Sequence, residues 1–324
     1  MCRPAARQQD DDKGLGIAGA RHPGHLLARG SALEQRINAH RAHVALVEAR
    51  TAHVFSQRIA FRHGFVPVGY LPQKHLLKQP ESVLLCARYF GDALTLRRNN
   101  PRSIPEVKPL AHQVFSNLGL VDDVIVDDSE QAYVAGGALE VAELTEGGLS
   151  PLLRIERGRT RRREVFGPTT LQQGFFKIAA SHSNYLLARG NAGETAGALG
   201  YLHDPLEHSL RILELVFSDE SAARTLLASA LERALTLGVR YVEIDVSASA
   251  PRLQRTLLEL GFVPCAYIPA MVFRDVERLD VVRFAWLSPD SVEETAQLEA
   301  PALALAESVR AEFAKSAVLP ELRR

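Results

Sequence analysis

The sequence predicts a mixed α/β fold, layered as in α+β proteins, in which helices flank a central mixed sheet and the unit is duplicated. Short β-branched runs alternate with helical patterns along most of the chain. The run from Val44 to Pro72 also returns as Tyr241 to Pro269, 197 residues later and without a gap. A repeat of this period indicates two copies of a medium-sized unit rather than one large domain.

Each copy of the repeat is expected to fold as strand, helix and strand. Gly64 and Gly261 end the two helical patterns, because glycine adopts the positive φ of a helix C-terminus at little cost. The predicted strands are 44–47 and 241–246, the helices 54–63 and 251–260, and the last strands of each copy 82–89 and 279–286. Eight positions are identical between the copies: Gln57/Gln254, Arg58/Arg255, Gly64/Gly261, Phe65/Phe262, Val66/Val263, Pro67/Pro264, Tyr70/Tyr267 and Pro72/Pro269.

The second copy is preceded by enough chain to complete a domain. A hairpin is expected from strands 184–189 and 196–203, followed by a strand at 210–217 and a helix at 222–237. The apolar positions of that helix fall on one stripe, and Gly238 ends it. Only about 43 residues precede the repeated strand of the first copy, so the first unit lacks a comparable front half.

Composition excludes several classes of partner. The 38 basic and 38 acidic residues cancel, so no overall field draws the chain to nucleic acid or to a membrane surface. No apolar run approaches the length of a membrane helix, and the polar amino terminus lacks the apolar core of a signal peptide. The three cysteines, Cys2, Cys86 and Cys265, have no metal-type spacing and suit free thiols in a reducing compartment. We therefore expect a cytoplasmic protein without a metal.

In its order of elements the second half resembles the GCN5-related N-acetyltransferase (GNAT) superfamily. The resemblance lies in hairpin, strand, helix, strand and helix, closed by Gly261-Phe262-Val263-Pro264, over about residues 139 to 287. The stretch from Val44 to Tyr89 resembles the same half of a second such domain. The expected organisation is a truncated GNAT-like unit (1–98), a linker with a helix at 110–118 and a strand at 121–126 (99–138), an acyltransferase domain (139–287) and a helical tail (288–324).

The resemblance implies that a loop opening the central helix binds the pyrophosphate of acetyl-CoA through backbone N–H groups and the helix dipole. The cofactor-binding positions carried over are Leu215, Val216, Ser218, Ser221, Ala222 and Ala223. The loop departs from the family pattern, since Ser218 replaces a basic residue and Asp219-Glu220 places negative charge near the phosphates. The alternative is that these residues simply start a helix with good capping groups.

The resemblance also implies an acid/base pair. Glu214, in the third strand with Leu213 and Leu215 as neighbours, is the expected base for the acceptor ammonium; the alternative is an ordinary strand carboxylate. The family's proton-donating tyrosine is replaced by Leu257, so Tyr267, beyond the Gly-Phe turn, is the candidate in its place. The alternative for Tyr267 is packing within a strand.

Two further motifs are open to more than one interpretation. Residues 14–19 (GLGIAG) fit either the glycine part of a phosphate loop or an unstructured amino terminus. A basic run between Arg157 and Arg163 could attract a phosphate or be a solvated surface.

The sequence therefore favours an acyl-CoA-dependent N-acyltransferase of the N-acetyltransferase type, acting on a small-molecule amine or a protein amino group, with acetyl-CoA as co-substrate. A homodimer is an open possibility for its assembly. The alternative, from a different class, is a catalytically silent GNAT-like module that binds a ligand or a partner. A cleft lined by unpaired backbone amides favours the enzyme, whereas a filled cleft favours the module.

Overall fold

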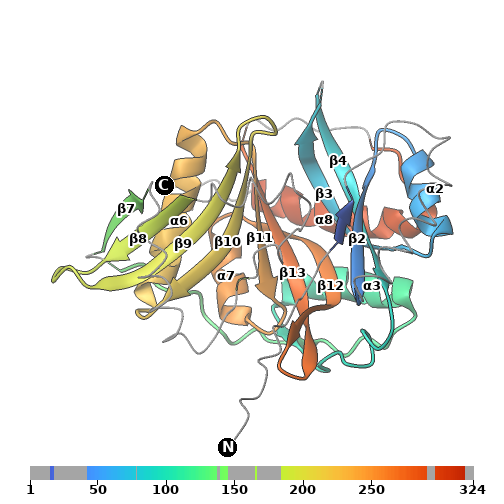
Figure 1. Ribbon diagram of the computed structural model, residues 1–324, viewed down its shortest axis with the longest axis horizontal. Helices are drawn as coiled ribbons and strands as arrows, with labels where there is room; N and C mark the ends of the chain where they lie inside the picture. The colour runs from blue at the N-terminus through green and yellow to red at the C-terminus, as the bar shows by residue number, and fades with distance from the viewer. Residues whose placement is uncertain are drawn as a thin grey trace, which may run out of the picture.

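The computed structural model describes residues 15–17, 42–77, 79–136, 139–144, 165, 184–289 and 296–317. Its centre is one mixed sheet of eleven strands in the order β1-β2-β4-β3-β12-β13-β11-β10-β9-β8-β7 (Figure 1). The predicted class, a mixed α/β sheet flanked by helices, is confirmed. The strands are β1 (Leu15–Ile17), β2 (Val44–Arg50), β3 (Val66–Leu76), β4 (Pro80–Tyr89), β7 (Glu140–Leu144), β8 (Asn184–Arg189), β9 (Thr195–Asp204), β10 (Ser209–Phe217), β11 (Tyr241–Ser247), β12 (Val263–Arg274) and β13 (Glu277–Leu287).

The carboxy-terminal strands follow the order expected for the more complete unit. Strands β7 to β10 form an antiparallel meander, and helix α6 (Ser221–Thr236) carries the chain to β11, which lies parallel to β10. Helix α7 (Pro251–Glu259) then leads to the hairpin β12–β13, whose second strand inserts beside β11. Gly261, at φ 86°, turns the chain out of α7 as its position predicts.

The amino-terminal strands repeat this pattern. Helix α2 (Phe55–Arg62) connects β2 to the hairpin β3–β4, and the strand order β2-β4-β3 matches β11-β13-β12. The irregularities also coincide. The register of β3 on β4 shifts between Pro67 and Gly69, and that of β12 on β13 shifts at the equivalent positions, Pro264 and Ala266. Gln73 and Ala270, also 197 positions apart, both adopt φ of 51°. Of the 14–19 motif, residues 15–17 form β1, parallel to β2; the rest lies outside the described residues, as does the basic run 157–163.

The two groups of strands join edge to edge at β3 and β12. The pair Ala266↔Gly69 links them, and the backbones approach so closely that a Cβ on Gly69 would lie 2.2 Å from the Ala266 Cβ. One apolar core runs through both groups and includes Val68, Phe284 and Leu226. The groups are therefore parts of one continuous structure.

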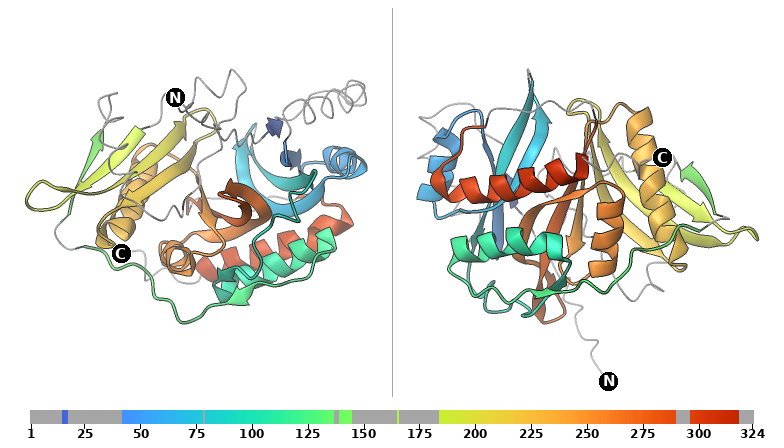
Figure 2. Two further views of the ribbon diagram at one scale, coloured as in Figure 1. Left: turned by 60° about the horizontal axis from the view of Figure 1, so that its bottom comes forward. Right: turned by 180° about the vertical axis from the view of Figure 1, so that it is seen from behind.

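Two helices cover this junction. Helices α3 (Lys108–Leu118) and α8 (Ala300–Ala317) both pack on β3 and β12 and lie side by side behind the sheet (Figure 2). The helix of the expected tail begins at Ala300 and carries Pro301 in its first turn, where proline is tolerated. In the part of the chain that the structure describes, no helix is both long and apolar enough to cross a membrane.

The linker differs in one detail from its prediction. Of the strand expected at 121–126 only β6 (Ile125–Val126) forms, paired with β5 (Arg102–Ser103). Asp122 and Asp123 bind Lys108 and Arg97 instead of continuing a strand. A short 3₁₀ turn (Pro105–Val107) then leads into α3.

Candidate functional site

An opening in the sheet separates the ends of β10 and β11. The two strands are paired in parallel over four positions, from Ser209↔Tyr241 to Ile212↔Ile244. The register of β10 on β9 then shifts between Ile212 and Glu214, which marks a β-bulge at Leu213. Beyond it, β10 stays on β9 and β11 stays on β13, and no further pair joins β10 to β11 among the described residues. Each strand therefore turns one backbone edge toward the opening.

Glu214 lies immediately beyond the bulge. Its side chain is 7% exposed, and the Tyr185 hydroxyl on β8 donates to Glu214 Oε2 at 3.4 Å. The Tyr185 ring covers Gly200 of β9 so closely that a Cβ there would come within 2.6 Å of a ring carbon. Gly200 thus permits the position from which Tyr185 reaches the carboxylate. Sequence reasoning did not identify Tyr185, because this relationship spans three strands.

Beyond the bulge, the two faces of β10 contact different apolar clusters. Leu215 packs in the main core on the side of the helices, whereas Val216 joins a small apolar cluster with Leu187 and Ala198 on the other side. Alternation along the strand places Glu214 on the same face as Val216. The side chains of the predicted cofactor positions Leu215 and Val216 therefore point to opposite faces. Only the Leu215 backbone faces the opening, because the Val216 backbone faces β9 in step with the bond from Ser218 N–H to Ala196 O.

The amino terminus of α6 follows at the end of β10. Ser221 N–H donates to Asp219 Oδ1 at 2.9 Å, and this hydrogen bond holds the pKa of Asp219 below its ordinary value. The N–H groups of Ala222 and Ala223 donate to the carbonyls of Asp219 and Glu220. Ser218, the remaining predicted phosphate residue, donates its backbone N–H to Ala196 O at 2.9 Å. In this arrangement, these N–H groups form hydrogen bonds within the protein and do not point to a phosphate site.

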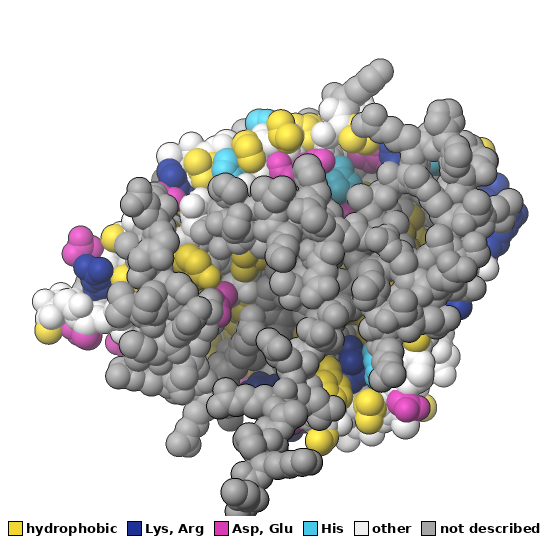
Figure 3. Space-filling model, in the orientation of Figure 1, with side chains coloured by type: hydrophobic (Ala, Val, Ile, Leu, Met, Phe, Trp, Pro, Cys, Tyr) yellow, Lys and Arg dark blue, Asp and Glu magenta, His cyan; other side chains and the backbone are white. Residues whose placement is uncertain are grey.

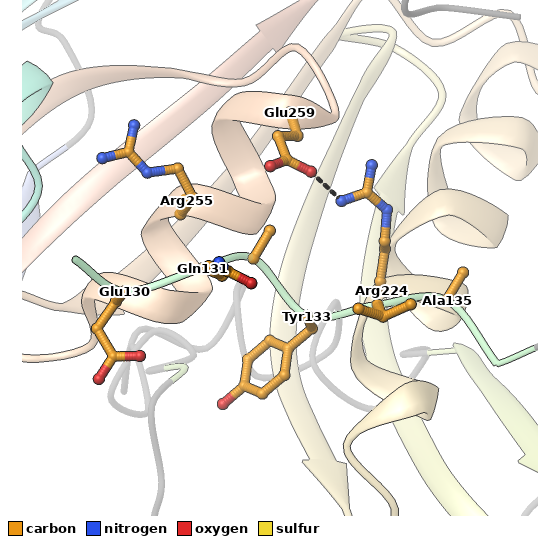
Figure 4. A pocket seen from close by; sticks show the side chains of 9 residues that line it. Glu130, Gln131, Tyr133, Ala135, Arg224, Arg255 and Glu259 are labelled. Atoms are coloured by element: carbon orange, nitrogen blue, oxygen red, sulfur yellow. Dashed lines mark hydrogen bonds and ion pairs between the residues drawn. The ribbon is translucent and has the colours of Figure 1, made fainter. Parts of the chain in front are cut away.

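Residues Ser129–Gly136, which we call the strap, cross from α7 to the start of α6 (Figure 4). Tyr133 of the strap lies between the two helices, buried to 6% exposure, and donates its backbone N–H to Thr256 Oγ1 of α7. A pocket of about 430 Å³ opens beside the strap, with Arg224, Arg255 and Glu259 on its helical walls. The strap thus covers the groove that leads to the amino terminus of α6.

The chain also enters the opening from a second direction. Val165 is fully buried and forms an antiparallel bridge with Val246 of β11. The other edge of Val246 is paired with Val282 of β13, so Val165 lies on the edge that faces β10. Part of the β11 edge is therefore already occupied by the chain itself.

Charged side chains from both groups of strands meet near the opening, and we call them the junction cluster. In the space-filling view, histidine and acidic side chains lie next to one another near the upper rim of the molecule (Figure 3). Lys74 Nζ lies 2.5 Å from Glu48 Oε1 and 3.1 Å from Glu243 Oε2, so one cation of β3 bridges β2 and β11. The cluster comprises Glu48, Lys74, His75, Glu207, Arg211, Glu243, Asp245 and Arg283.

The cluster holds its carboxylates ionised. Burial opposes the charge of Glu243, but Arg283, Lys74 and Arg211 outweigh it and hold the pKa of this carboxyl well below its ordinary value. Arg283 also binds Asp245 through Nε at 2.6 Å, and the pKa of Asp245 is lowered for the same reason. The cluster therefore joins the two groups of strands electrostatically rather than providing a free base.

Tyr267 lies elsewhere. It is fully buried on β12, and its hydroxyl donates to Asp280 Oδ2 at 2.6 Å. Burial and the charge of Asp280 raise its pKa well above the ordinary value. Two strands separate β12 from β10, about 14 Å at the usual strand spacing. The structure therefore does not bring Tyr267 together with Glu214, because the residue after the Gly-Phe turn faces the core beneath α3.

Comparisons with known proteins add a distant likeness. No family model and no curated protein matches the chain. Among solved structures, the spermidine N-acetyltransferase from Vibrio cholerae in complex with CoA and spermine is 17% identical, with a TM-score of 0.37, over 47% of this chain and 96% of that one. A dodecameric structure of the same enzyme in an intermediate state gives 17% identity and a TM-score of 0.38, over 47% of this chain and 95% of that one. Likeness at this level determines neither activity nor substrate.

Proposed function

We propose that the chain is an acyl-CoA-dependent N-acyltransferase of the N-acetyltransferase type, with its reaction centre at the opening between β10 and β11. The observation that carries this proposal is the bulge at Leu213, which ends the parallel pairing of the two strands and places Glu214 at the start of the gap. The edge of β10 that faces the gap suits an extended acyl carrier, and a carboxylate beside it suits an amine acceptor.

In this proposal, an amine attacks the thioester carbonyl of acetyl-CoA, so that a C–N bond forms and the C–S bond breaks. The departing coenzyme A thiolate takes up, directly or through water, the proton that the new amide nitrogen loses. Glu214 accepts the proton that the incoming ammonium must lose, directly or through water. The Tyr185 hydroxyl, within hydrogen-bond distance of Glu214, fixes the position of the carboxylate. The backbone amide of Leu215, beyond the bulge, is placed to donate a hydrogen bond to the carbonyl oxygen as negative charge develops on it. The Val216 amide faces β9, in step with the bond from Ser218 N–H to Ala196 O.

We further propose that the two groups of strands arose by duplication of one GNAT-like unit. Their common strand order, coincident bulges and matching backbone conformations at Gln73 and Ala270 support this origin. Three points stay predictions: an acceptor that is a small-molecule or a protein amine, the cytoplasmic location, and assembly as a homodimer. The two described cysteines, Cys86 and Cys265, are both free and buried, as the proposed location requires.

The test measures acetyl transfer from acetyl-CoA to a panel of primary amines by the intact chain. The readout is the release of the coenzyme A thiol. Wild type should release thiol only when an acceptor is present, and Glu214→Gln should lower kcat by about 10²–10⁴-fold. Glu232→Gln, an exposed glutamate of α6, is the matched control and should leave kcat unchanged. Equal rates for wild type and Glu214→Gln would remove Glu214 from the reaction.

A second function, a catalytically silent binding module, is favoured by two observations. Val165 occupies part of the β11 edge, and the strap covers the start of α6. A module of this kind would show no thiol release with any acceptor, including in variants that expose the groove.

A further inference from the structure

The strap is attached to both helices that it crosses. At α7, the Tyr133 N–H bonds to Thr256 Oγ1 at 2.9 Å, and the guanidinium of Arg252 lies 4.3 Å from the centre of the Tyr133 ring. Toward the sheet, the ring meets Phe217, the last residue of β10, edge-on at 5.4 Å. Tyr133 thereby fills the space between α7 and the end of β10.

The far end of the strap lies against the first residue of α6. A Cβ on Gly136 would come within 2.6 Å of Ser221 Oγ, so only glycine lets the backbone pass this closely. Between the two attachment points, Val134 is 76% exposed. The strap is therefore held at Tyr133 and at Gly136.

The groove beneath the strap is walled by arginines that are already paired. Arg252 binds Glu220 at 2.7 Å, and Arg255 binds Glu106 at 2.9 Å. Arg224 of α6 binds Glu259 of α7 directly across the groove (Figure 4). Arginines in such partly exposed pairs can exchange a carboxylate for a phosphate, which is bound with similar forked geometry.

We propose that the strap is an autoinhibitory cover of the acyl-CoA site, and that it must leave the groove between α6 and α7 before the phosphates of the cofactor reach Arg224 and Arg252. The inference rests on the proposed function, because that function gives the start of α6 an anionic ligand. It explains why the loop before α6 can lack a basic residue at Ser218, since the walls of the groove supply the positive charge.

The inference is tested by isothermal titration of free coenzyme A into the full-length chain and three strap variants. Tyr133→Ala removes the aromatic anchor, and Gly136→Ala forces the strap off Ser221 without altering the groove. Each should tighten binding by about 10-fold or more, because affinity scales with the fraction of molecules whose site is open. Val134→Ala is the matched control and should bind as wild type does. Adding Arg224→Gln to Tyr133→Ala should reverse much of the gain.

Hydrogen–deuterium exchange of residues 129–136 without ligand reports whether the strap has opened in each variant, and thermal unfolding confirms that it is folded. Faster exchange with tighter coenzyme A binding in Tyr133→Ala and Gly136→Ala is the expected result. If exchange is faster but coenzyme A affinity equals that of wild type, the strap does not inhibit binding, and the proposed function is unaffected. Faster exchange with no binding by any variant overturns the proposed function, and the cover with it. If Tyr133→Ala unfolds, Gly136→Ala decides the same question alone.

Discussion

Gln57 and Gln254 occupy equivalent positions in the two groups of strands and make the same hydrogen bonds. Both side chains are fully buried. Gln57 Nε2 donates to the carbonyl of Arg50 at 3.1 Å, and Gln254 Nε2 donates to the carbonyl of Ser247 at 2.9 Å. In each group the amide thus ties the helix back to the end of the preceding strand.

The side-chain oxygen of each glutamine accepts a hydrogen bond from a segment that follows the other group in sequence. Gln57 Oε1 accepts the backbone N–H of Glu299, just before α8, at 3.0 Å. Gln254 Oε1 accepts the N–H of Ile104, ahead of α3, at 3.2 Å. Because α3 follows the first group in sequence and α8 follows the second, each glutamine binds the segment that follows the other group. Both helices pack on β3 and on β12, so each of them covers both groups.

Replacing either glutamine with leucine should destabilise the whole fold. Gln254→Leu leaves the Ile104 N–H and the Ser247 carbonyl without these partners, and each such buried loss costs about 1–3 kcal/mol. Urea unfolding should show a lower free energy of unfolding for Gln254→Leu and Gln57→Leu in a single transition. Gln113→Leu, whose amide bonds only to Asn117 within α3, is the control and should change it by about 0.5 kcal/mol or less. Two separate transitions in either variant would contradict the shared fold.

Lys74 is expected to be the critical cation of the junction cluster. Lys74→Met leaves Glu48 and Glu243 without their shared partner, and a buried pair broken on one side costs on the order of 3–5 kcal/mol. The control is Arg98→Met at the exposed pair Arg98–Glu277, which should cost about 0–1 kcal/mol. Chemical denaturation compares the two. An equal small loss in both variants would show that Lys74 does not join β3 to β11.

His75 should make stability depend on pH. Burial lowers its pKa, but the hydrogen bond and charge of Glu48 outweigh burial, with a further contribution from Glu207 and opposition from Lys74. The net pKa is raised above the ordinary value of about 6.5. A raised pKa stabilises the folded state fully below about pH 6.5, and this contribution is lost as pH rises through the folded-state pKa.

The measurement is the free energy of unfolding of wild type and His75→Gln between about pH 6 and pH 9. The advantage of wild type over the variant should be largest at the acidic end and shrink as pH rises. An advantage that is constant, or that grows with pH, would contradict the ion pairs of His75 with Glu48 and Glu207.

Tyr185 is expected to act as a positioning residue for Glu214. Tyr185→Phe removes the hydrogen bond that fixes the position of the carboxylate. A displaced base should lower kcat by about 10-fold and leave the KM for acetyl-CoA unchanged. Tyr201→Phe is the matched control, because the buried Tyr201 hydroxyl bonds to Glu143 instead. An equal loss of kcat in both variants would indicate a merely structural role.

Much of the fold could be predicted because its signals are local. The repeat, the glycines that end α2 and α7, and the apolar stripe of α6 each depend on neighbours in sequence. The junction of β3 with β12 could not be predicted, since no pattern distinguishes an edge that pairs with the other group from one that faces solvent. Gly69 is the residue that permits this junction. Only its contact with Ala266 across the junction shows why glycine is needed there.

The candidate site was predictable only in part. Glu214 stands out as a carboxylate in an apolar strand, but its relation to Tyr185 depends on how β8, β9 and β10 are aligned. Tyr267 looked accessible from its position after a turn, whereas the packing of α3 places it in the core with Asp280. The strap could not be found from sequence, because Tyr133 and Gly136 carry no pattern of their own.

The most direct test of the central claim is hydrogen–deuterium exchange of the full-length chain with and without saturating acetyl-CoA. Acetyl-CoA should slow exchange at residues 214–223, the end of β10 and the start of α6, and should speed exchange at 129–136 as the strap leaves. Residues 44–65 of the first group, which include β2 and α2, should be unchanged. Unaltered exchange throughout, or protection confined to residues 44–65, would contradict an acyl-CoA site between β10 and β11.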